Sequence, residues 1–246
     1  MEKKRNSIEF KITGRYALFS DPVTRIGGEK FSYQIPTYQA LIGILESIYW
    51  KPTFIWYVDA VRVINKIQTE SKGVKPLKMS GGNDLSYYTY LRDVEYQTLA
   101  HFEWNEHRAK EFENDRDEHK HHNIAKRSVK KGGRRDIFLG ARECQGYIEP
   151  CAFNEGTGFY DGYGELDFGI QFHGFDYPDN TGKNELAVRL WKAKMIDGII
   201  KFPTPTDCEP SLRRVIRPMT KKEFKSDTNF TFIKDDVSVS DLKMEV

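Results

Sequence analysis

The sequence predicts an α+β fold in which residues 1–150 follow the order β-α-β-β-α-β and residues 151–219 form a smaller β-rich domain. Three observations support this prediction. Apolar and polar residues alternate over residues 8–19, as in a half-buried strand. Apolar residues recur at helical spacing after Pro36, and residues 119–131 read as a basic helix closed by glycine. An antiparallel four-stranded sheet with two helices on one face is also the architecture of RNA-recognition domains.

The elements of residues 1–150 follow from this apolar pattern. The first strand contains Gly14, which we expect to form a β-bulge. The first helix begins after Pro36 and ends before Pro52, because proline fits the first turn of a helix but cannot continue one. A long loop with several glycines separates the middle strands, and we expect it to be functional or mobile. The other strand stretches are residues 54–58, 61–67, 94–104, 137–139 and 143–148, and the loop contains Gly73, Gly81 and Gly82.

After Pro150 the sequence becomes rich in glycine and then in short strands. Asp197-Gly198 lies between two apolar stretches and is a strong signal for a β-hairpin turn. Residues 220–246 combine few apolar side chains with mixed charge, so we expect an irregular tail. The three predicted strands are residues 166–172, 186–195 and 199–202.

Composition argues against several classes of protein. The 246 residues are 39% hydrophobic with a mean hydropathy of -0.64, and no apolar run approaches the roughly 18 residues of a membrane helix. Residues 1–6 are charged where an export signal would lead into an apolar segment, so we predict no export. Three cysteines without a CxxC pair argue against disulfides and against a cysteine zinc site. We therefore predict a reducing, cytoplasmic compartment and no membrane partner.

Positive charge is concentrated in one segment. The net charge of the chain is only +2, yet residues 116–135 contain eight Lys/Arg and two acidic residues. Such a surface suits a polyanion, although a solvated helix face is the ordinary alternative. The segment ends in Gly132-Gly133, where paired glycines let the backbone approach a phosphate or simply cap a helix. The basic residues that we expect to hold RNA are Arg127, Lys130, Lys131, Arg134 and Arg135.

Histidine and lysine within this segment suit metal-free RNA cleavage. In that reaction a 2′-hydroxyl attacks the adjacent phosphate, so one proton is removed, another is delivered and phosphate charge is neutralised. His121 suits the proton transfers, and Lys120 suits the charge. Both lie at the start of the predicted helix, where backbone N–H groups favour a phosphate. Tyr49, at the end of the first helix, offers a phenolic donor or a stacking surface.

Each of these residues also has an ordinary structural explanation. His121 shares a helix face with Ala125 and Val129, which fits a half-buried structural histidine. Lys120 fits a solvated surface lysine, and Tyr49 fits a core aromatic residue. From residue pattern alone these alternatives stay open.

A metal site is the remaining alternative. His119, His121 and His122 are close in sequence, but adjacent histidines point about 100° apart on a helix, and no HExxH motif is present. We therefore predict neither a metal nor another cofactor.

Several motifs closely resemble the subtype I-C (Dvulg) CRISPR-associated Cas protein family five of the RAMP superfamily. The resemblance runs from about residue 8 to about residue 218, and its most specific part is the fourteen-residue stretch Lys131–Cys144. The other motifs are Tyr16-Ala17-Leu18-Phe19, Ile26-Gly27-Gly28-Glu29-Lys30, Ile48-Tyr49-Trp50-Lys51-Pro52 and residues 67–74.

The resemblance implies a ferredoxin-like, RRM-related N-terminal domain and a smaller antiparallel C-terminal domain. It also implies an endoribonuclease that cuts precursor CRISPR RNA near the base of the repeat hairpin, without metal, leaving 5′-hydroxyl and 2′,3′-cyclic phosphate ends. Such proteins then stay on the 5′ handle of the crRNA in a surveillance complex with large and backbone subunits. The family's cutting members carry a Tyr, a Lys and an adjacent His, which match Tyr49, Lys120 and His121. The flanking His119 and His122 leave open which imidazole transfers the proton.

Two other readings compete with this one. The first is a structural RNA-binding subunit that holds the handle without cutting it, and the second is a metal-dependent nuclease. The basic segment is also compatible with non-specific binding of duplex DNA.

Overall fold

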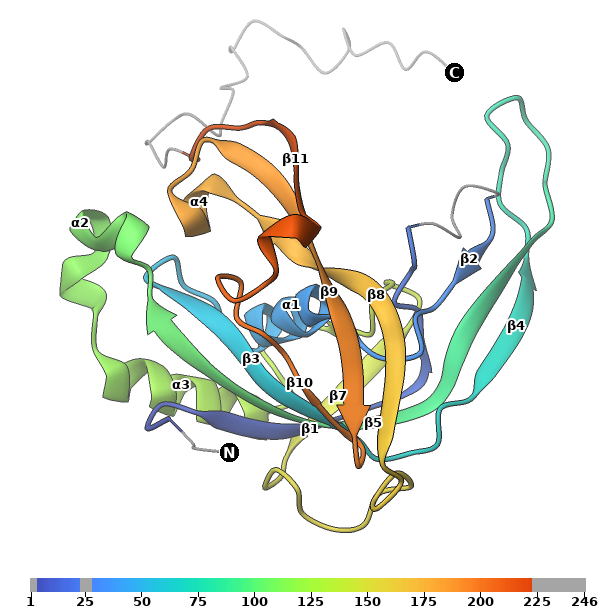
Figure 1. Cartoon of the computed structure of the whole chain (residues 1–246), viewed down its shortest axis with the longest axis horizontal. Helices are drawn as coiled ribbons and strands as arrows, with labels where there is room; N and C mark the ends of the chain where they lie inside the picture. Colours follow the sequence, from blue (N-terminus) through green and yellow to red (C-terminus); the bar gives the residue numbers. More distant parts are fainter. Residues whose placement is uncertain (1–3, 23–27, 223–246) are drawn as a thin grey trace, which may run out of the picture.

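The computed structural model describes residues 4–22 and 28–222 of the chain. These residues form a mixed α and β structure whose framework is one large, mainly antiparallel sheet (Figure 1). This combination of helices with a mainly antiparallel sheet agrees with the predicted α+β class. Only the first three residues of the predicted tail, 220–246, fall within the described residues, so the prediction for the rest of the tail lies outside them.

Four long strands form the centre of the sheet, in the order β3-β5-β1-β7 with every neighbouring pair antiparallel. Two helices, α1 (Tyr38–Ile48) and α3 (Glu118–Lys130), connect them. Along the chain these six elements follow the predicted order β-α-β-β-α-β, with shorter strands inserted between them. The strands are β1 (Ile8–Ala17), β3 (Phe54–Val63), β5 (Ser86–Trp104) and β7 (Gln145–Pro150).

Other strands extend this sheet at its edges, whereas β2 (Lys30–Phe31) and β4 (Thr69–Val74) pair with the first part of β5. The short β10 pairs with β3, so the strands that follow residue 150 join the same hydrogen-bonded sheet. Besides the four central strands, the sheet contains β2 (Lys30–Phe31), β4 (Thr69–Val74), β6 (Ile137–Phe138), β8 (Glu165–Asp176), β9 (Glu185–Ile196), β10 (Ile199–Lys201) and β11 (Arg213–Pro218). The short helices are α2 (Ala109–Phe112) and α4 (Pro178–Thr181), with 3-10 turns at Glu106–Arg108, Glu113–Asp115 and Pro210–Leu212.

Local sequence explains where α1 and α3 begin and end. The Thr37 side chain accepts a hydrogen bond from the backbone N–H of Ala40 at 3.2 Å and so caps α1. The Asp117 carboxylate caps α3 in the same way, through the backbone N–H of Lys120 at 3.0 Å. At the other end of α3, Gly132 takes a φ of 80°, and Gly133 donates to the carbonyl of Ser128 at 2.9 Å. This glycine-dependent cap turns the chain sharply before Arg134.

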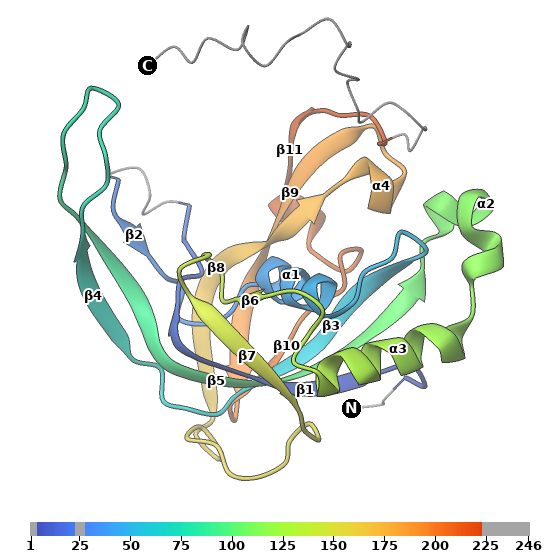
Figure 2. The same cartoon turned by 180° about the vertical axis from the view of Figure 1, so that it is seen from behind.

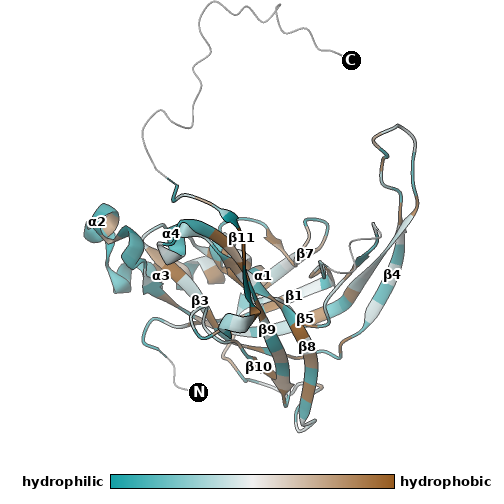
Figure 3. Ribbon diagram, turned by 45° about the horizontal axis from the view of Figure 1, so that its top comes forward, coloured by the Kyte–Doolittle hydropathy of each residue, from teal (hydrophilic) through white to brown (hydrophobic). Residues whose placement is uncertain are grey.

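The strands after residue 150 show the alternation expected of a sheet with one covered face. Along β9, buried and more exposed residues alternate. Figure 3 shows that both hydrophobic and hydrophilic residues occur along this strand. The predicted hairpin turn is confirmed: Asp197 and Gly198, with φ values of 47° and 79°, join β9 to β10. The thiols of Cys144, Cys151 and Cys208 are free, as predicted.

Two details of the sequence prediction are wrong. Gly14 pairs in register with Val94, so it forms no bulge. A Cβ atom there would lie 2.3 Å from Leu139 Cδ1, and glycine is required by this close approach instead. The predicted long loop is largely a hairpin, because β4 pairs with the first part of β5, and this hairpin projects from the body of the molecule (Figures 1 and 2).

Within the part of the chain that the structure describes, no helix is both long and apolar enough to cross a membrane.

Candidate active site

Tyr49 lies directly after α1 and is held through its backbone as well as its ring. Its N–H donates to the carbonyl of Leu45 at 2.9 Å, and its own carbonyl accepts from Trp56 Nε1 at 2.7 Å. The side chain is buried, with 1% of its surface exposed. The end of α1 and the start of β3 therefore set the position of the phenol.

His121 lies in the first turn of α3 and points into the core, with 0% of its surface exposed. Its Nδ1 atom lies 2.7 Å from the Tyr49 hydroxyl oxygen, and its Nε2 atom lies 2.6 Å from the backbone carbonyl oxygen of Asp115. The structure therefore brings Tyr49 and His121 into direct contact across 72 residues of sequence. Three aromatic rings enclose the imidazole, with centroids at 5.3, 5.8 and 6.4 Å: Phe54, Trp104 and Phe102.

These two contacts define which nitrogen of the neutral imidazole carries the hydrogen. A carbonyl oxygen can only accept, so His121 Nε2 carries a hydrogen and donates it to Asp115. In the neutral ring, Nδ1 is then the acceptor for the Tyr49 O–H. Burial raises the pKa of the Tyr49 phenol, with a smaller contribution from the negative charge of Asp115, so this hydroxyl stays protonated and donating.

Lys120 lies at the surface beside this pair, with its side chain 47% exposed. Its Nζ atom lies 2.5 Å from Asp115 Oδ1, and Thr53 Oγ1 donates to Asp115 Oδ2 at 2.8 Å. The hydrogen bond from Lys120, followed by that from Thr53, lowers the pKa of the Asp115 carboxyl. The three residues that the sequence singled out thus meet around Asp115.

The five basic residues predicted to hold RNA all lie on the surface around the end of α3. None of them forms an ion pair with a residue in ranges 4–22 or 28–222, so their charge is not neutralised there. The backbone N–H groups of Arg134 and Arg135 both donate to the carbonyl of Ser47 at 3.2 Å, which docks this loop on the end of α1. The residues are Arg127, Lys130, Lys131, Arg134 and Arg135.

A cavity of about 410 Å³ lies between the end of α1 and this loop. The Arg134 guanidinium lies 5.5 Å from the centroid of the Tyr49 ring, within cation–π range. The Tyr49 ring thus contacts one of the exposed basic residues at the end of α3. Side chains that border the cavity include Glu46, Tyr49, Trp50, Lys51, Arg134 and Arg135.

The other two histidines of the segment have partners of their own. His119 Nε2 lies 2.9 Å from Arg5 Nη2, and His122 Nε2 lies 2.9 Å from the carbonyl oxygen of Ser7. Within the described residues, no group of three or more His, Cys, Asp or Glu side chains is arranged to hold a metal ion. The structure therefore gathers Tyr49 and Lys120 around His121, and around neither neighbouring imidazole.

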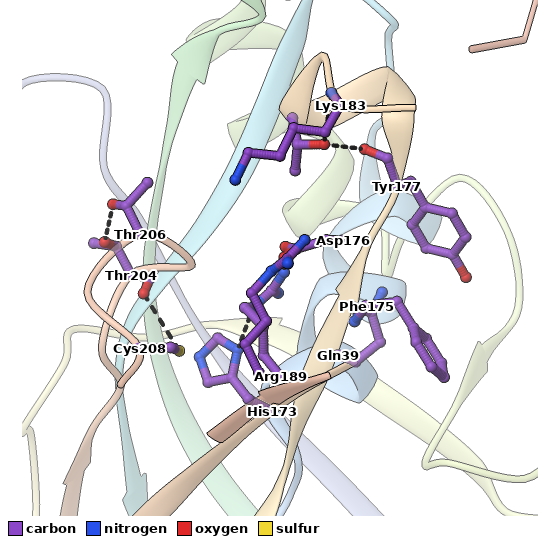
Figure 4. A network of polar contacts seen from close by, with 12 residues as sticks. Gln39, His173, Phe175, Asp176, Tyr177, Lys183, Arg189, Thr204, Thr206 and Cys208 are labelled. Atoms are coloured by element: carbon purple, nitrogen blue, oxygen red, sulfur yellow. Dashed lines mark hydrogen bonds and ion pairs between the residues drawn. The ribbon is translucent and has the colours of Figure 1, made fainter. Parts of the chain in front are cut away.

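A second buried polar network lies between β8 and β9, where pattern reasoning from the sequence had placed no site (Figure 4). Arg189 forms an ion pair with Asp176 and donates through Nε to His173 Nδ1 at 3.4 Å. The His173 ring stacks on Tyr38 with a centroid distance of 4.1 Å. Asp176 and Arg189 of this network border a cavity of about 670 Å³.

Sequence reasoning missed Asp115 and Thr53 because neither belongs to a motif with a chemical signature. The one available signal was the Asp-x-Asp spacing before α3. Asp117 is the N-cap of α3, which leaves Asp115 free for another role.

The fold and the site together define a class: an α/β protein built on an antiparallel sheet, with a buried Tyr–His pair beside a cationic surface. A model of the Cas5d family, described as a CRISPR-associated protein, matches residues 7–203. The chain therefore belongs to the Cas5d family of CRISPR-associated proteins, as its motifs indicated.

Two curated relatives are both named CRISPR pre-crRNA endoribonuclease Cas5d. The Thermus thermophilus protein is 28% identical over 193 residues, which cover 74% of this chain and 79% of the relative. The Mannheimia succiniciproducens protein is 32% identical over 106 residues, which cover 39% of this chain and 46% of the relative.

Two solved structures share the fold over most of the chain. One, titled as the crystal structure of a CRISPR-associated protein, has 38% identity and a TM-score of 0.72, covering 87% of this chain and 98% of its own. The other is a functionally uncharacterized protein of Streptococcus mutans, SMU1763c, with 40% identity and a TM-score of 0.69, covering 85% and 96%.

Proposed function

We propose that this protein is a metal-independent, repeat-specific endoribonuclease that cleaves precursor CRISPR RNA near the base of the repeat hairpin. It then stays with the 5′ handle in the subtype I-C surveillance complex, in contact with the large and backbone subunits. The names of the curated relatives support this proposal. The single observation that carries it is the hydrogen-bonded arrangement of Tyr49, His121 and Lys120 around Asp115.

The reaction forms a bond between the 2′ oxygen and phosphorus and breaks the bond from phosphorus to O5′. One proton leaves the 2′-hydroxyl and one reaches O5′, which gives the cyclic phosphate and the 5′-hydroxyl. Because His121 is buried, we propose that its Nδ1 exchanges protons with RNA through the Tyr49 hydroxyl. Lys120, the exposed member, stabilises the charge that develops on the phosphate.

The rest of the chain binds and orients the RNA in this proposal. Arg127, Lys130, Lys131, Arg134 and Arg135, which have no ion-pair partner among residues 4–22 and 28–222, hold the phosphate backbone. The strand order β3-β5-β1-β7 with two connecting helices supports a ferredoxin-like domain over residues 1–150. Residues 151–219 would form the smaller β-rich domain.

Lys120→Ala is the sharpest test, because Lys120 is exposed and its loss leaves the core intact. Purified protein is incubated with its cognate repeat RNA in excess EDTA, and product sizes and end groups are resolved. We expect one specific cut with a cyclic phosphate in the wild type and a loss of about 10²-fold or more in the variant. Lys126→Ala, an exposed lysine on the same helix, is the matched control and should cut normally.

A structural role without cleavage is the second candidate, and the burial of both Tyr49 and His121 favours it. Under that role, the EDTA incubation leaves the RNA intact but bound. Cleavage that appears only when a divalent metal is added would instead favour a metal-dependent nuclease.

A further inference from the structure

Asp115 contacts both members of the candidate site that would carry charge during the reaction. Its carboxylate holds Lys120 Nζ at 2.5 Å, and the same carboxylate lies 3.6 Å from His121 Nε2. Its backbone carbonyl accepts from that nitrogen at 2.6 Å. No other carboxylate in the described residues is paired with either side chain.

The position of Asp115 is itself constrained. It ends a 3-10 turn, Glu113–Asp115, just before α3, and Thr53 at the start of β3 donates to its second oxygen. The carboxylate is thus held from two elements while it faces the first turn of α3. A side chain with all its oxygens engaged in this way is pre-organised and not freely solvated.

We infer that Asp115 is a positioning residue that fixes the Nε2–H form of His121, stabilises the imidazolium when His121 takes a proton, and holds the Lys120 ammonium at the mouth of the site. This inference rests on the proposed function and adds a residue to it. It also explains why Nδ1, and not Nε2, meets the Tyr49 hydroxyl.

The charges around the imidazole are few, which makes the effect of Asp115 measurable. Lys120 on α3 is paired with Asp115, and the Arg134 guanidinium lies 5.5 Å from the centroid of the Tyr49 ring. From β3 and β5 only uncharged rings face it, with Arg116 stacked 5.9 Å from the centroid of Trp104 on the outer side. The Asp115 carboxylate is the sole anion that the described residues place against His121.

The test compares Asp115→Asn with Asp117→Asn. Asparagine keeps the size of the side chain and can still accept from Thr53, but it removes the charge. Asp117→Asn is the matched control, because asparagine also caps helices and the substitution removes a charge two residues away. The ring signals of His121 are followed by NMR from pH 4 to pH 9, and single-turnover cleavage of the repeat RNA is measured in EDTA over the same range.

In Asp115→Asn we expect the His121 ring signals to titrate at a lower pH than in the wild type, since the carboxylate 3.6 Å from Nε2 has lost its charge. The pH at which cleavage rises should fall with it, and the maximal rate should fall about 10- to 100-fold. Asp117→Asn should match the wild type in both readouts.

An unchanged His121 titration in Asp115→Asn, or an equal shift in Asp117→Asn, would overturn the inference. A lower cleavage rate with an unmoved pH profile would overturn it too, because a merely structural role has that signature. A wild-type protein that does not cleave in EDTA would refute the proposed function, whereas the NMR titration would still decide the role of Asp115.

Discussion

Two histidines of this protein are both completely buried, yet opposite charges surround them. His121 faces the Asp115 carbonyl and carboxylate on one side and the Tyr49 phenol on the other. His173 accepts from the Arg189 guanidinium and lies 3.1 Å from the carbonyl oxygen of Pro203. Burial, followed by the positive charge of Arg189, lowers the pKa of His173 to about 3.

The comparison shows that burial alone does not separate a structural histidine from a reactive one. A cation against His173 opposes any added proton, so this ring stays neutral and serves packing. The Asp115 carboxylate lies 3.6 Å from His121 Nε2, and the solvent-exposed Lys120 is paired with the same carboxylate. The electrostatic surroundings, more than exposure, distinguish the two.

The largest expected difference in cleavage rate is between a variant that removes His121 and one that removes His173. His121→Ala should slow cleavage by about 10² to 10⁴-fold while the RNA still binds. His173→Phe keeps the stacking on Tyr38 and should cut at the wild-type rate. Single-turnover cleavage with binding by fluorescence anisotropy separates the two effects, and thermal melting monitors folding. If both variants fold and lose the same factor in cleavage rate, His121 is not reactive in a way that His173 is not.

The next largest effect on cleavage concerns Tyr49 and Tyr38, the tyrosines that contact His121 and His173. Tyr49→Phe keeps the ring but removes the O–H that meets His121, so cleavage should fall by about 10²-fold or more. The Tyr38 hydroxyl is buried and has no hydrogen-bond partner among the described residues, so Tyr38→Phe should leave cleavage unchanged and shift the free energy of unfolding by less than about 0.5 kcal/mol. If Tyr49→Phe cuts within about twofold of wild type, the phenol is not the route for the proton.

The sequence predicted the positions of Tyr49 and His121 better than their environments. Helical spacing placed Tyr49 at the end of α1 and His121 in the first turn of α3, because each local pattern is dominated by its own apolar face. The order of the six main elements followed from the same patterns. The prediction also allowed His121 to be a half-buried structural residue, and its burial is complete.

The contact of Asp115 with Thr53 and the contacts of His173 and Arg189 could not be predicted, since each joins residues from different elements of the fold. Arg189 reads as an ordinary polar residue of an alternating strand, and its partner Asp176 comes from the preceding strand. The β4–β5 hairpin was likewise hidden, because β4 is polar and partly exposed and lacks the apolar alternation that marks a covered strand.

Acidification should destabilise the protein through His173 in particular. In the unfolded chain this residue titrates near pH 6.5, and in the folded chain near 3, so the unfolded state binds more protons between these values. Stability contributed by the neutral ring is present above about pH 6.5 and is lost as the pH falls toward 3. Between pH 6.5 and 5, this loss is about 2 kcal/mol.

Chemical unfolding of the wild type and of His173→Phe at several pH values measures this contribution. The difference in the free energy of unfolding between the two proteins should shrink on acidification, because phenylalanine has no proton to gain. A difference that stays constant from pH 7 to pH 5 would show that His173 does not titrate as an isolated, cation-facing ring.

The smallest effect concerns two arginines, Arg135 in the loop after α3 and Arg213 in β11. Arg135 is exposed and has no ion-pair partner in the described residues, whereas Arg213 bonds Asp176 at 2.7 Å and Glu185 at 2.6 Å. An unpaired cation that meets a phosphate releases a counterion, so Arg135→Gln should weaken RNA binding a few-fold and lower the slope of log affinity against log salt by about 0.7 to 0.9. Arg213→Gln should leave this slope unchanged, because its charge is already neutralised within the fold. Anisotropy titrations of the repeat RNA at four salt concentrations measure both slopes, and a larger change in Arg213→Gln would move the RNA path from the α3 surface to the β8–β11 side of the molecule.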